Sequence, residues 1–237
     1  HTRYSAVTGV QTCALPIYQG AYASPETINA YEVGFKSELF DRSLRLNGAL
    51  FQYDYKNQQF EDVQGISSVL VNAGKSRLRG AELEVVLAPV AGLQLSLSGL
   101  YLDAKYRELT LQGHDLAGNT MISSPEWSGT AAVDYTVAVS ETFDFGLHLD
   151  ANTRTHQWYN AFNGQFNNQN IGQAGYTLVN GRLSLRSKDG YEVALWVKNL
   201  FDKQYVSYAI NIQSAFGMDY LMDGPPRTFG ASISYRF

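Results

Sequence analysis

The sequence predicts an all-β fold, an antiparallel transmembrane β-barrel of which the chain holds only a part, and three observations support it. From about residue 28 onward, apolar and polar residues alternate with a period of two, as they do along a strand with one apolar face. Several of these segments reach the ~9–11 residues with which a tilted strand crosses a bilayer. Short and long connections alternate between them, which is typical of a barrel with short turns on one side of a membrane and long loops on the other.

The predicted strands number about nine. They are 28–39, 43–62, 69–87, 92–106, 126–138, 142–158, 175–187, 190–208 and 226–237. Tight turns lie at 40–43, 88–92, 139–142 and 187–190, and long connections at about 63–68, 107–125, 159–174 and 209–225. The last strand follows a long loop, so it descends to the periplasm, and by alternation residue 28 begins outside. Single-chain barrels usually have an even strand count, so this arrangement predicts a fragment whose front is missing.

One face of each strand is expected to meet lipid and the other water. The rows headed by Phe143 and Leu93 are apolar and are the expected lipid face. The expected lumen-facing charges are Glu32, Lys36, Glu82, Glu84, Asp144, Asp150, Arg154, Arg182 and Arg186. Around Leu50 to Tyr55 the phase is ambiguous. Arg77 and Arg79 share the parity of Leu83, which either a bulge or a strand rising above the membrane explains.

Composition agrees with this fold class. The chain has 237 residues, of which 45% are apolar and 13% aromatic, and a formal net charge of −4. No run of about 18 apolar residues occurs, which excludes a helical membrane span but not alternating strands. Frequent aromatic residues suit a membrane–water boundary. The slightly acidic balance, without a Lys/Arg cluster, argues against nucleic acid as a partner.

The first residues do not follow the pattern. Residues 1–18 have neither helical nor strand periodicity and no secretory signal, so we predict a non-native or disordered N-terminal segment, followed by a partial barrel over residues 19–237. A disordered remnant of an extracellular loop is the alternative. Cys13 has no partner for an internal disulfide, and no two Cys or His residues have the spacing of metal ligands. We expect neither a metal site nor a cofactor.

Five short motifs occur in a recognisable order across residues 24–237. They are SPETINAYEVGFK, NAGKSRLRGAELEV, SPEWSG, VKNLFDKQY and PPRTFGASISYRF. Their defining residues are Pro25, Glu26, Tyr31, Glu32, Gly34, Gly80, Glu82, Asn199, Leu200, Phe201, Asp202, Tyr205, Pro226 and Arg227. Together they resemble the TonB-dependent outer-membrane receptors of the siderophore and iron-complex type, as the C-terminal part of a 22-stranded barrel.

The resemblance implies a location in the outer membrane of a Gram-negative bacterium and uptake of an iron–siderophore or a similar nutrient. Its implied partners are outer-membrane lipid, the barrel-assembly machinery and the ligand. The family's TonB-box and plug motifs do not occur in this sequence. We therefore expect the TonB complex to act only through the missing N-terminal region, and the fragment alone not to transport.

The chain ends in the alternating pattern that the resemblance associates with barrel assembly. Phe229, Ile233, Tyr235 and Phe237 are the residues predicted to form this signal. The last strand must pair with the first to remove open edges. Until the barrel closes, its apolar face and its unpaired backbone N–H and C=O groups must be bound by another protein. Ordinary aromatic residues of an interfacial belt are the alternative interpretation.

A candidate ligand site lies where one strand ends and an Asn/Gln-rich loop begins. Arg154, His156, Trp158 and Tyr159 combine a cation with aromatic rings, which suits an anionic, planar iron complex. A polar loop with girdle aromatics is the alternative.

Two other functions stay open. A small complete barrel would act as a passive pore or adhesin, and a hydrolase on the barrel rim would require His114, Asp115 or Asp150 to converge on one pocket. No motif indicates a nucleophile, so we predict that the chain is not an enzyme.

Overall fold

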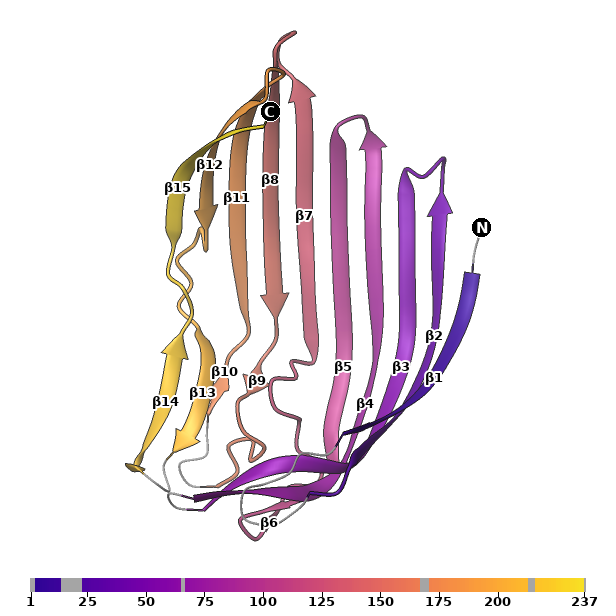
Figure 1. Ribbon diagram of the computed structural model, residues 1–237, viewed down its shortest axis with the longest axis vertical. Helices are drawn as coiled ribbons and strands as arrows, with labels where there is room; N and C mark the ends of the chain where they lie inside the picture. The colour runs from indigo at the N-terminus through magenta and orange to yellow at the C-terminus, as the bar shows by residue number, and fades with distance from the viewer. Residues whose placement is uncertain (1–2, 14–22, 65–66, 167–170, 213–215, 237) are drawn as a thin grey trace.

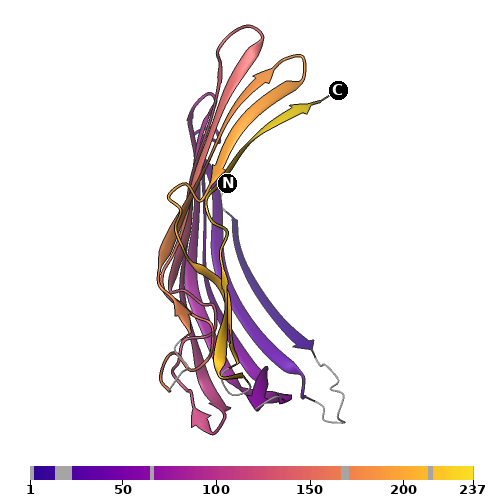
Figure 2. The ribbon, with the colours of Figure 1, turned by 90° about the vertical axis from the view of Figure 1, so that its left-hand side faces the viewer.

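The computed structural model describes residues 3–13, 23–64, 67–166, 171–212 and 216–236. Most of them form one antiparallel sheet that curves into an open trough (Figures 1 and 2). Its strands are β1 (Arg3–Cys13), β2 (Glu26–Leu39), β3 (Leu44–Gln64), β4 (Ser67–Val90), β5 (Leu93–Leu111), β7 (Trp127–Ala138), β8 (Phe143–Arg154), β11 (Tyr176–Ser187), β12 (Tyr191–Lys198) and β15 (Thr228–Tyr235). They pair in that order, and the short β6 (His114–Asp115) pairs with β5.

Two small sheets lie toward the loop end, the lower end of Figure 1, below β8, β11, β12 and β15. β9 (Gln157–Trp158) pairs with β10 (Gly172–Gln173), and β13 (Val206–Ile212) pairs with β14 (Met218–Asp223). The tight turns gather at the opposite end. Nearly all strands therefore run between a turn end and a loop end, as the alternation of short and long connections predicted. In the part of the chain that the structure describes, no helix has the length and apolar character needed to span a membrane.

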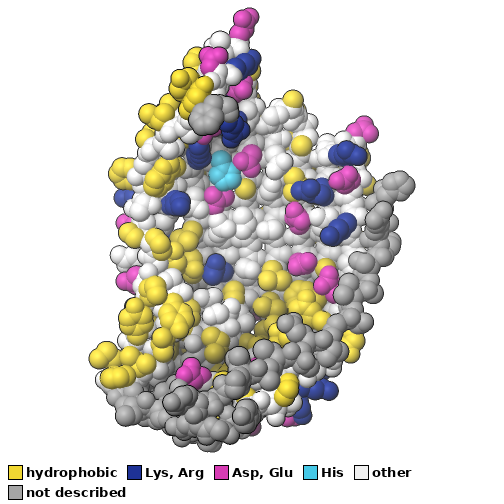
Figure 3. Space-filling model, viewed as in Figure 1, with side chains coloured by type: hydrophobic (Ala, Val, Ile, Leu, Met, Phe, Trp, Pro, Cys, Tyr) yellow, Lys and Arg dark blue, Asp and Glu magenta, His cyan; other side chains and the backbone are white. Residues whose placement is uncertain are grey.

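Register fixes which residues share a face. Glu84 stands opposite Asn47 on β3 and Ser98 on β5, and Thr130 and Asn152 continue this row across β7 and β8. Side chains of this row line the hollow of the trough. Figure 3, which views the concave face, shows Lys, Arg, Asp and Glu side chains spread over it.

The alternate residues form the outer row, which is apolar and exposed. Leu97 is 52% exposed, Leu195 58% and Phe143 40%, and no second layer of the described chain covers them. The predicted apolar face is thus on the outside of the trough and not in a dry core, and its contact with lipid stays a prediction. Because no described segment covers the outer face, the hydrogen-bond ladders between neighbouring strands hold the long strands together.

The buried apolar clusters of the described chain lie at the loop end. Tyr106, Leu109, Leu111, Leu116, Ala161 and Phe162 form the larger cluster, which joins the end of β5 to the loops that follow β5 and β9. Asn119 and Gln165 exchange hydrogen bonds between the same two loops, and the Asn163 side chain both donates to and accepts from the Thr120 backbone. These loops therefore pack on each other and on β5.

Four predicted boundaries are wrong. The strand expected at 190–208 ends at Lys198 and resumes as β13 at Val206, and the loop expected at 209–225 contains β14. The strand expected at 142–158 ends at Arg154, followed only by the two residues of β9. β5 runs to Leu111, past the expected end at 106. Residues 198–205 do not alternate between apolar and polar, so the sequence held a signal for the break after β12 that the strand assignment passed over.

The structure places part of the segment 1–18 in the sheet. β1 pairs with β2 along its whole length, from Arg3 opposite Lys36 to Cys13 opposite Glu26. The sequence of β1 lacks strand periodicity, but backbone ladder bonds do not require it. The prediction that residues 1–18 are non-native concerns their origin and stays a prediction.

Candidate functional site

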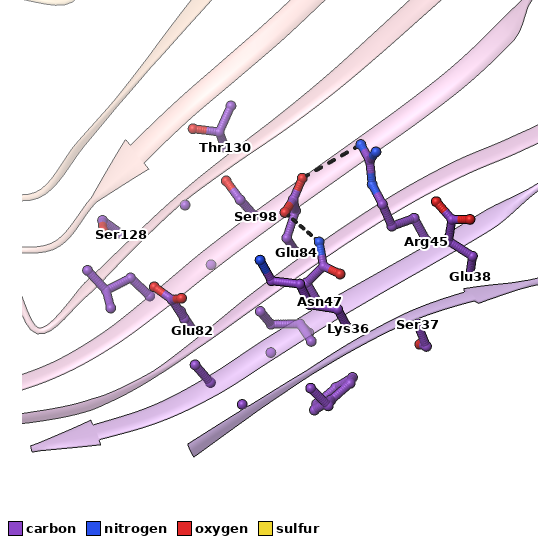
Figure 4. Close-up of a pocket in the computed structure, with 18 of the residues that line it drawn as sticks. Lys36, Ser37, Glu38, Arg45, Asn47, Glu82, Glu84, Ser98, Ser128 and Thr130 are labelled. Atoms are coloured by element: carbon purple, nitrogen blue, oxygen red, sulfur yellow. Dashed lines mark hydrogen bonds and ion pairs between the residues drawn. The ribbon is translucent and has the colours of Figure 1, made fainter. Parts of the chain in front are cut away.

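The concave face holds a hollow of about 1630 Å³ that extends across β2, β3, β4, β5, β7 and β8. Figure 4 shows Lys36, Asn47, Glu82 and Glu84 among the side chains that line it. Asn47 donates to Glu84 over 2.9 Å, and Arg45 lies 4.0 Å from the same carboxylate. Glu32, Lys36 and Glu82 have no hydrogen bond or ion pair with another described residue. This half of the concave face therefore presents unpaired charge.

On the other half of the concave face, formed by β7, β8, β11 and β12, hydrogen bonds and ion pairs link the charged side chains of neighbouring strands. His148 Nδ1 lies 2.7 Å from Asp134 and its Nε2 lies 3.3 Å from Asp150. Asp150 also accepts hydrogen bonds from Asn152 (2.6 Å) and Asn180 (2.8 Å), so it joins side chains of β8 and β11. Farther toward the turn end, Arg182 and Arg186 both pair with Glu192. The expected lumen charges Asp150, Arg182 and Arg186 are thus members of wall networks.

At the loop end of the concave row a cation lies over one tyrosine ring, which in turn stacks on a second. The Arg154 guanidinium lies 5.4 Å from the centroid of the Tyr176 ring, and Tyr176 stacks on Tyr205 at 4.6 Å with an interplanar angle of 25°. Arg154 is exposed and makes no ion pair with a carboxylate of the described chain, whereas the Tyr176 side chain is buried. This arrangement offers an oriented positive charge beside aromatic surface, which suits an anion with a planar part.

The other three residues of the predicted ligand site do not join Arg154. The His156 and Trp158 rings meet edge to face at 4.4 Å and line a separate hollow of about 360 Å³ with Lys105 and Glu126. Tyr159 is buried and its hydroxyl donates to the Val206 carbonyl, so it is part of the loop packing. The structure therefore divides the four residues among two hollows and one buried cluster.

Sequence reasoning missed the aromatic residues that face inward from β3. The Phe51 and Tyr53 rings stack at 5.1 Å with an interplanar angle of 22°. A Cβ at Gly80 would lie 2.7 Å from Phe51 Cζ, so the glycine leaves room for the ring. The ambiguous phase around these residues was the available signal, since Leu50 on the outer row is also large and apolar.

The hydrolase alternative gains no geometric support. His114 stacks on the Phe166 ring at 3.8 Å, Asp115 accepts the Ala117 backbone N–H, and Asp150 belongs to the His148 network. These residues bond different partners on different elements and do not converge on one pocket. Among the described residues, no group of three or more His, Cys, Asp or Glu side chains has a metal-binding arrangement.

Several motif residues form a tight turn between β12 and β13, which we call the C-terminal junction (Asn199–Tyr205 with Gly224–Arg227). The Asn199 side chain is buried, donates to the carbonyls of Lys203 (3.0 Å) and Pro225 (3.2 Å) and accepts from Lys203 N–H (2.8 Å). Asp202 accepts the Arg227 backbone N–H at 2.9 Å. The hydrogen bonds of the turn therefore connect the segment after β12 to the segment before β15.

A second set of motif residues forms the N-terminal junction (Ser24–Glu26 with Asn57–Gln59 and Asn72). Ser24 N–H donates to the Asn72 side chain at 2.6 Å, and Asn72 donates to the carbonyls of Ser24 and Asn57, both at 2.8 Å. Glu26 accepts the Gln59 N–H. Here the register between β3 and β4 shifts, but both strands continue.

The terminal row has the predicted orientation. Phe229, Ile233 and Tyr235 are 79%, 78% and 52% exposed on the outer row of β15, and the Tyr235 ring lies 4.5 Å from that of Tyr191. Phe237 lies outside the described residues. The role of these side chains as an assembly signal stays a prediction.

Comparison with known proteins identifies the family. The family model described as TonB dependent receptor-like, beta-barrel matches residues 5–200. The chain belongs to this family. The match begins within β1 and ends in the C-terminal junction of this TonB-dependent receptor barrel. One curated relative is described as an outer membrane transporter, and membership of this family assigns the chain to the outer membrane of a Gram-negative bacterium.

Curated relatives of this TonB-dependent receptor chain are siderophore receptors. The ferric-pyoverdine M114 receptor PbuA of Pseudomonas sp. (strain M114) is 30% identical over 100% of this chain and 28% of its own length. The ferrichrome outer membrane transporter/phage receptor of Escherichia coli (strain K12) is 30% identical over 92% of this chain and 27% of its own length. The chain thus spans little more than a quarter of these relatives.

Solved structures agree with the fold. The ferric yersiniabactin uptake receptor FyuA from Yersinia pestis has a TM-score of 0.75 at 18% identity, over 98% of this chain and 33% of its own. The ferric preacinetobactin receptor BauA from Acinetobacter baumannii has a TM-score of 0.70 at 20% identity, over 99% of this chain and 34% of its own. At these identities the likeness concerns the fold.

Proposed function

We propose that this chain is part of an outer-membrane transporter for an iron–siderophore or a similar scarce nutrient, and that its concave face contributes to the ligand site. The relatives named above support the class of cargo. The stacked Arg154, Tyr176 and Tyr205 carry the proposal for the site, because they hold an unpaired cation on an aromatic surface at the loop end of the concave row.

The inward-facing aromatic residues support the same site from a second wall. Phe51 and Tyr53 lie on β3, which β4, β5 and β7 separate from β8 and its Arg154, and the β13–β14 hairpin that follows Tyr205 in the chain has exposed apolar side chains. A ferric chelate with organic rings buries apolar surface and carries charge. Apolar walls with few polar groups are the usual composition of a small-molecule site.

We infer that the fragment alone does not transport. The described residues form wall strands and loops, so energy coupling by the TonB complex is assigned to an N-terminal region outside this chain. Lipid and the barrel-assembly machinery are proposed partners of the outer row and of β15. Enzymatic chemistry has no supporting site in the described residues.

The test uses the complete reading frame that contains this chain. Arg154→Gln is expected to weaken binding of anionic ferric chelates about tenfold, or ~1.4 kcal/mol, because the stacked charge is lost while the rings remain. Binding is measured by titration of the purified receptor. Arg45→Gln, which removes a concave-face cation remote from the rings, is the matched control and is expected to bind normally.

Unchanged binding by Arg154→Gln would remove Arg154 from the site. If instead the wild-type receptor bound no ferric chelate and conducted ions steadily in a planar bilayer, the passive-pore alternative would replace the transporter.

A further inference from the structure

The β13–β14 hairpin has one face on which every side chain is apolar or aromatic. Residues that stand directly opposite each other in an antiparallel pair project to the same side. Three such pairs form this face, and they are Tyr208 with Met222, Ile210 with Tyr220, and Ile212 with Met218. We call these six residues the apolar strip. Five of them are 40–56% exposed, and Ile212 is half-buried.

The opposite face of the hairpin holds it on the neighbouring loop. Ala209 is buried in a cluster with Tyr159 and Ile171, which lie between β9 and β10 in the chain. The Val206 N–H donates to the Gln173 side chain at 2.8 Å, and the Val206 carbonyl accepts the Tyr159 hydroxyl. Hydrophobic side chains gather over β13 and β14 in the view of the concave face (Figure 3, lower left). The hairpin is therefore anchored from one side, while the described chain leaves the apolar strip uncovered.

The base of the hairpin adjoins the proposed ligand site. Tyr205 directly precedes β13, and it stacks on Tyr176, over which the Arg154 guanidinium lies. The Gly224 N–H donates to the Tyr205 carbonyl at 2.8 Å, so the residues before β13 and after β14 are fixed together. Tyr208 follows Tyr205 by three residues, or at most about 10 Å of extended chain. The apolar strip thus begins close to the cation and its rings.

The side chains of the apolar strip favour a flexible apolar guest. Tyr208 and Tyr220 carry its two hydroxyls, and the other four side chains are isoleucine and methionine. With so few hydrogen-bonding groups, the strip binds apolar surface without demanding a fixed orientation. Methionine side chains are unbranched and adaptable, so Met218 and Met222 can follow the shape of a guest. An alkyl chain meets these conditions better than a polar ring system does.

The dimensions of the apolar strip argue against a protein partner. Tyr208 to Ile212 spans about 14 Å along β13, and the two strands lie about 5 Å apart. A stable protein interface takes about 800 Å² from each partner, several times what a strip two strands wide offers. A single extended chain lying along the hairpin matches its length and width.

We propose that the ligand of this receptor is amphiphilic, an anionic ferric chelate whose headgroup lies at Arg154 and whose alkyl tail lies along the apolar strip. The inference rests on the proposed function and narrows its class of substrate. The cation and rings of the stack take the charged chelate, and the strip takes the methylene groups that water solvates poorly.

The test uses the complete receptor in detergent. A ferric catecholate, a ferric hydroxamate and a ferric hydroxycarboxylate are each made with and without an octanoyl tail, and their binding is titrated. In Tyr220→Thr/Met222→Thr, we expect binding of the tailed form to weaken at least tenfold more than binding of the tailless form, because the tail loses its apolar contacts. Detergent takes up the tail equally in every sample, so this comparison between wild type and variant does not depend on it.

Leu221→Thr is the matched control. Leu221 is 53% exposed, close to the 51% of its neighbour Tyr220, but it projects from the opposite face of the hairpin. The substitution removes a similar apolar surface away from the strip. We expect Leu221→Thr to keep the wild-type ratio between the affinities for the tailed and tailless chelates. Heat-dependent gel mobility checks that all variants are folded.

Equal weakening of both forms by the strip variant would overturn the proposal. So would a lower midpoint urea concentration without any change in the affinity ratio, because the strip would then be covered by another part of the receptor. The proposed function has a separate outcome. If a tailless chelate binds wild type and depends on Arg154 while its tail has no effect, only the amphiphilic ligand is wrong. If no chelate binds in either form, the transporter assignment fails as well.

Discussion

The N-terminal and C-terminal junctions use similar residues at the loop end of the sheet, but they treat the strands differently. At the N-terminal junction, Asn72 bridges Ser24 and Asn57 while β3 and β4 continue beyond it. At the C-terminal junction, the strands on both sides end, and β13 and β14 form a separate sheet. Asn72 is exposed and Asn199 is buried. An asparagine side chain thus has two different roles. Asn72 adds hydrogen bonds beside two strands that stay paired, whereas Asn199 supplies the hydrogen bonds where the pairing of strands stops.

The largest effect is expected from Asn199→Ala. The substitution removes three hydrogen bonds from a buried turn and leaves the Lys203 N–H and two carbonyls without these partners, and it places alanine at a φ of 51°. We expect a loss of about 3 kcal/mol in the free energy of unfolding. Urea titration of the complete receptor, followed by heat-dependent gel mobility, measures it.

Asn199→Gly is the control for this substitution, because glycine accepts the backbone angle but makes no side-chain bonds. Its stability is expected to lie between those of Asn199→Ala and wild type. If Asn199→Ala and wild type unfold at the same midpoint urea concentration, Asn199 does not stabilise the junction by its hydrogen bonds.

A smaller effect is expected from Gly224→Ala, which tests the packing of the same junction. A Cβ at residue 224 would lie 2.0 Å from Tyr205 Cζ, so the ring has to move from its stack on Tyr176. We expect a cost of about 2 kcal/mol and faster proteolysis within the β13–β14 hairpin. Limited proteolysis with mass spectrometry locates the cleavage.

The Tyr205→Ala/Gly224→Ala double variant separates the clash from other causes. Removing the ring removes the obstacle, so the double variant is expected to match Tyr205→Ala alone rather than the sum of both losses. Additive losses would contradict a direct contact.

The smallest effect is expected from Asn72→Ala at the N-terminal junction. The lost hydrogen bonds are exposed and water replaces them, so the expected cost is about 1 kcal/mol in the same urea titration. Arg227→Ala is the matched control at the other junction, since its side chain makes only a 3.4 Å contact with the Leu200 carbonyl and is exposed. An Asn72→Ala loss equal to that of Asn199→Ala would remove the distinction between the junctions.

The predicted ligand residues show where sequence reasoning ended. Arg154 was found because a cation at a strand end is visible in the chain, and its position on the concave row follows from period-two alternation. Tyr176 and Tyr205 were not found. The pairing of β8 with β11 brings Tyr176 to Arg154, and the turn after β12 brings Tyr205 to Tyr176. Tyr159, which the sequence grouped with Arg154 in the candidate ligand site, is buried in a cluster of loop residues.

The sequence by itself determined the fold class, the two faces of each strand and the family, because all three depend on local alternation and on short motifs. It also held a signal for the break after β12. Only the tertiary structure decided which inward residues meet and which side chains bond across the two junctions. These features depend on register between strands and on turn hydrogen bonds between distant residues, which a pattern of single residues does not encode.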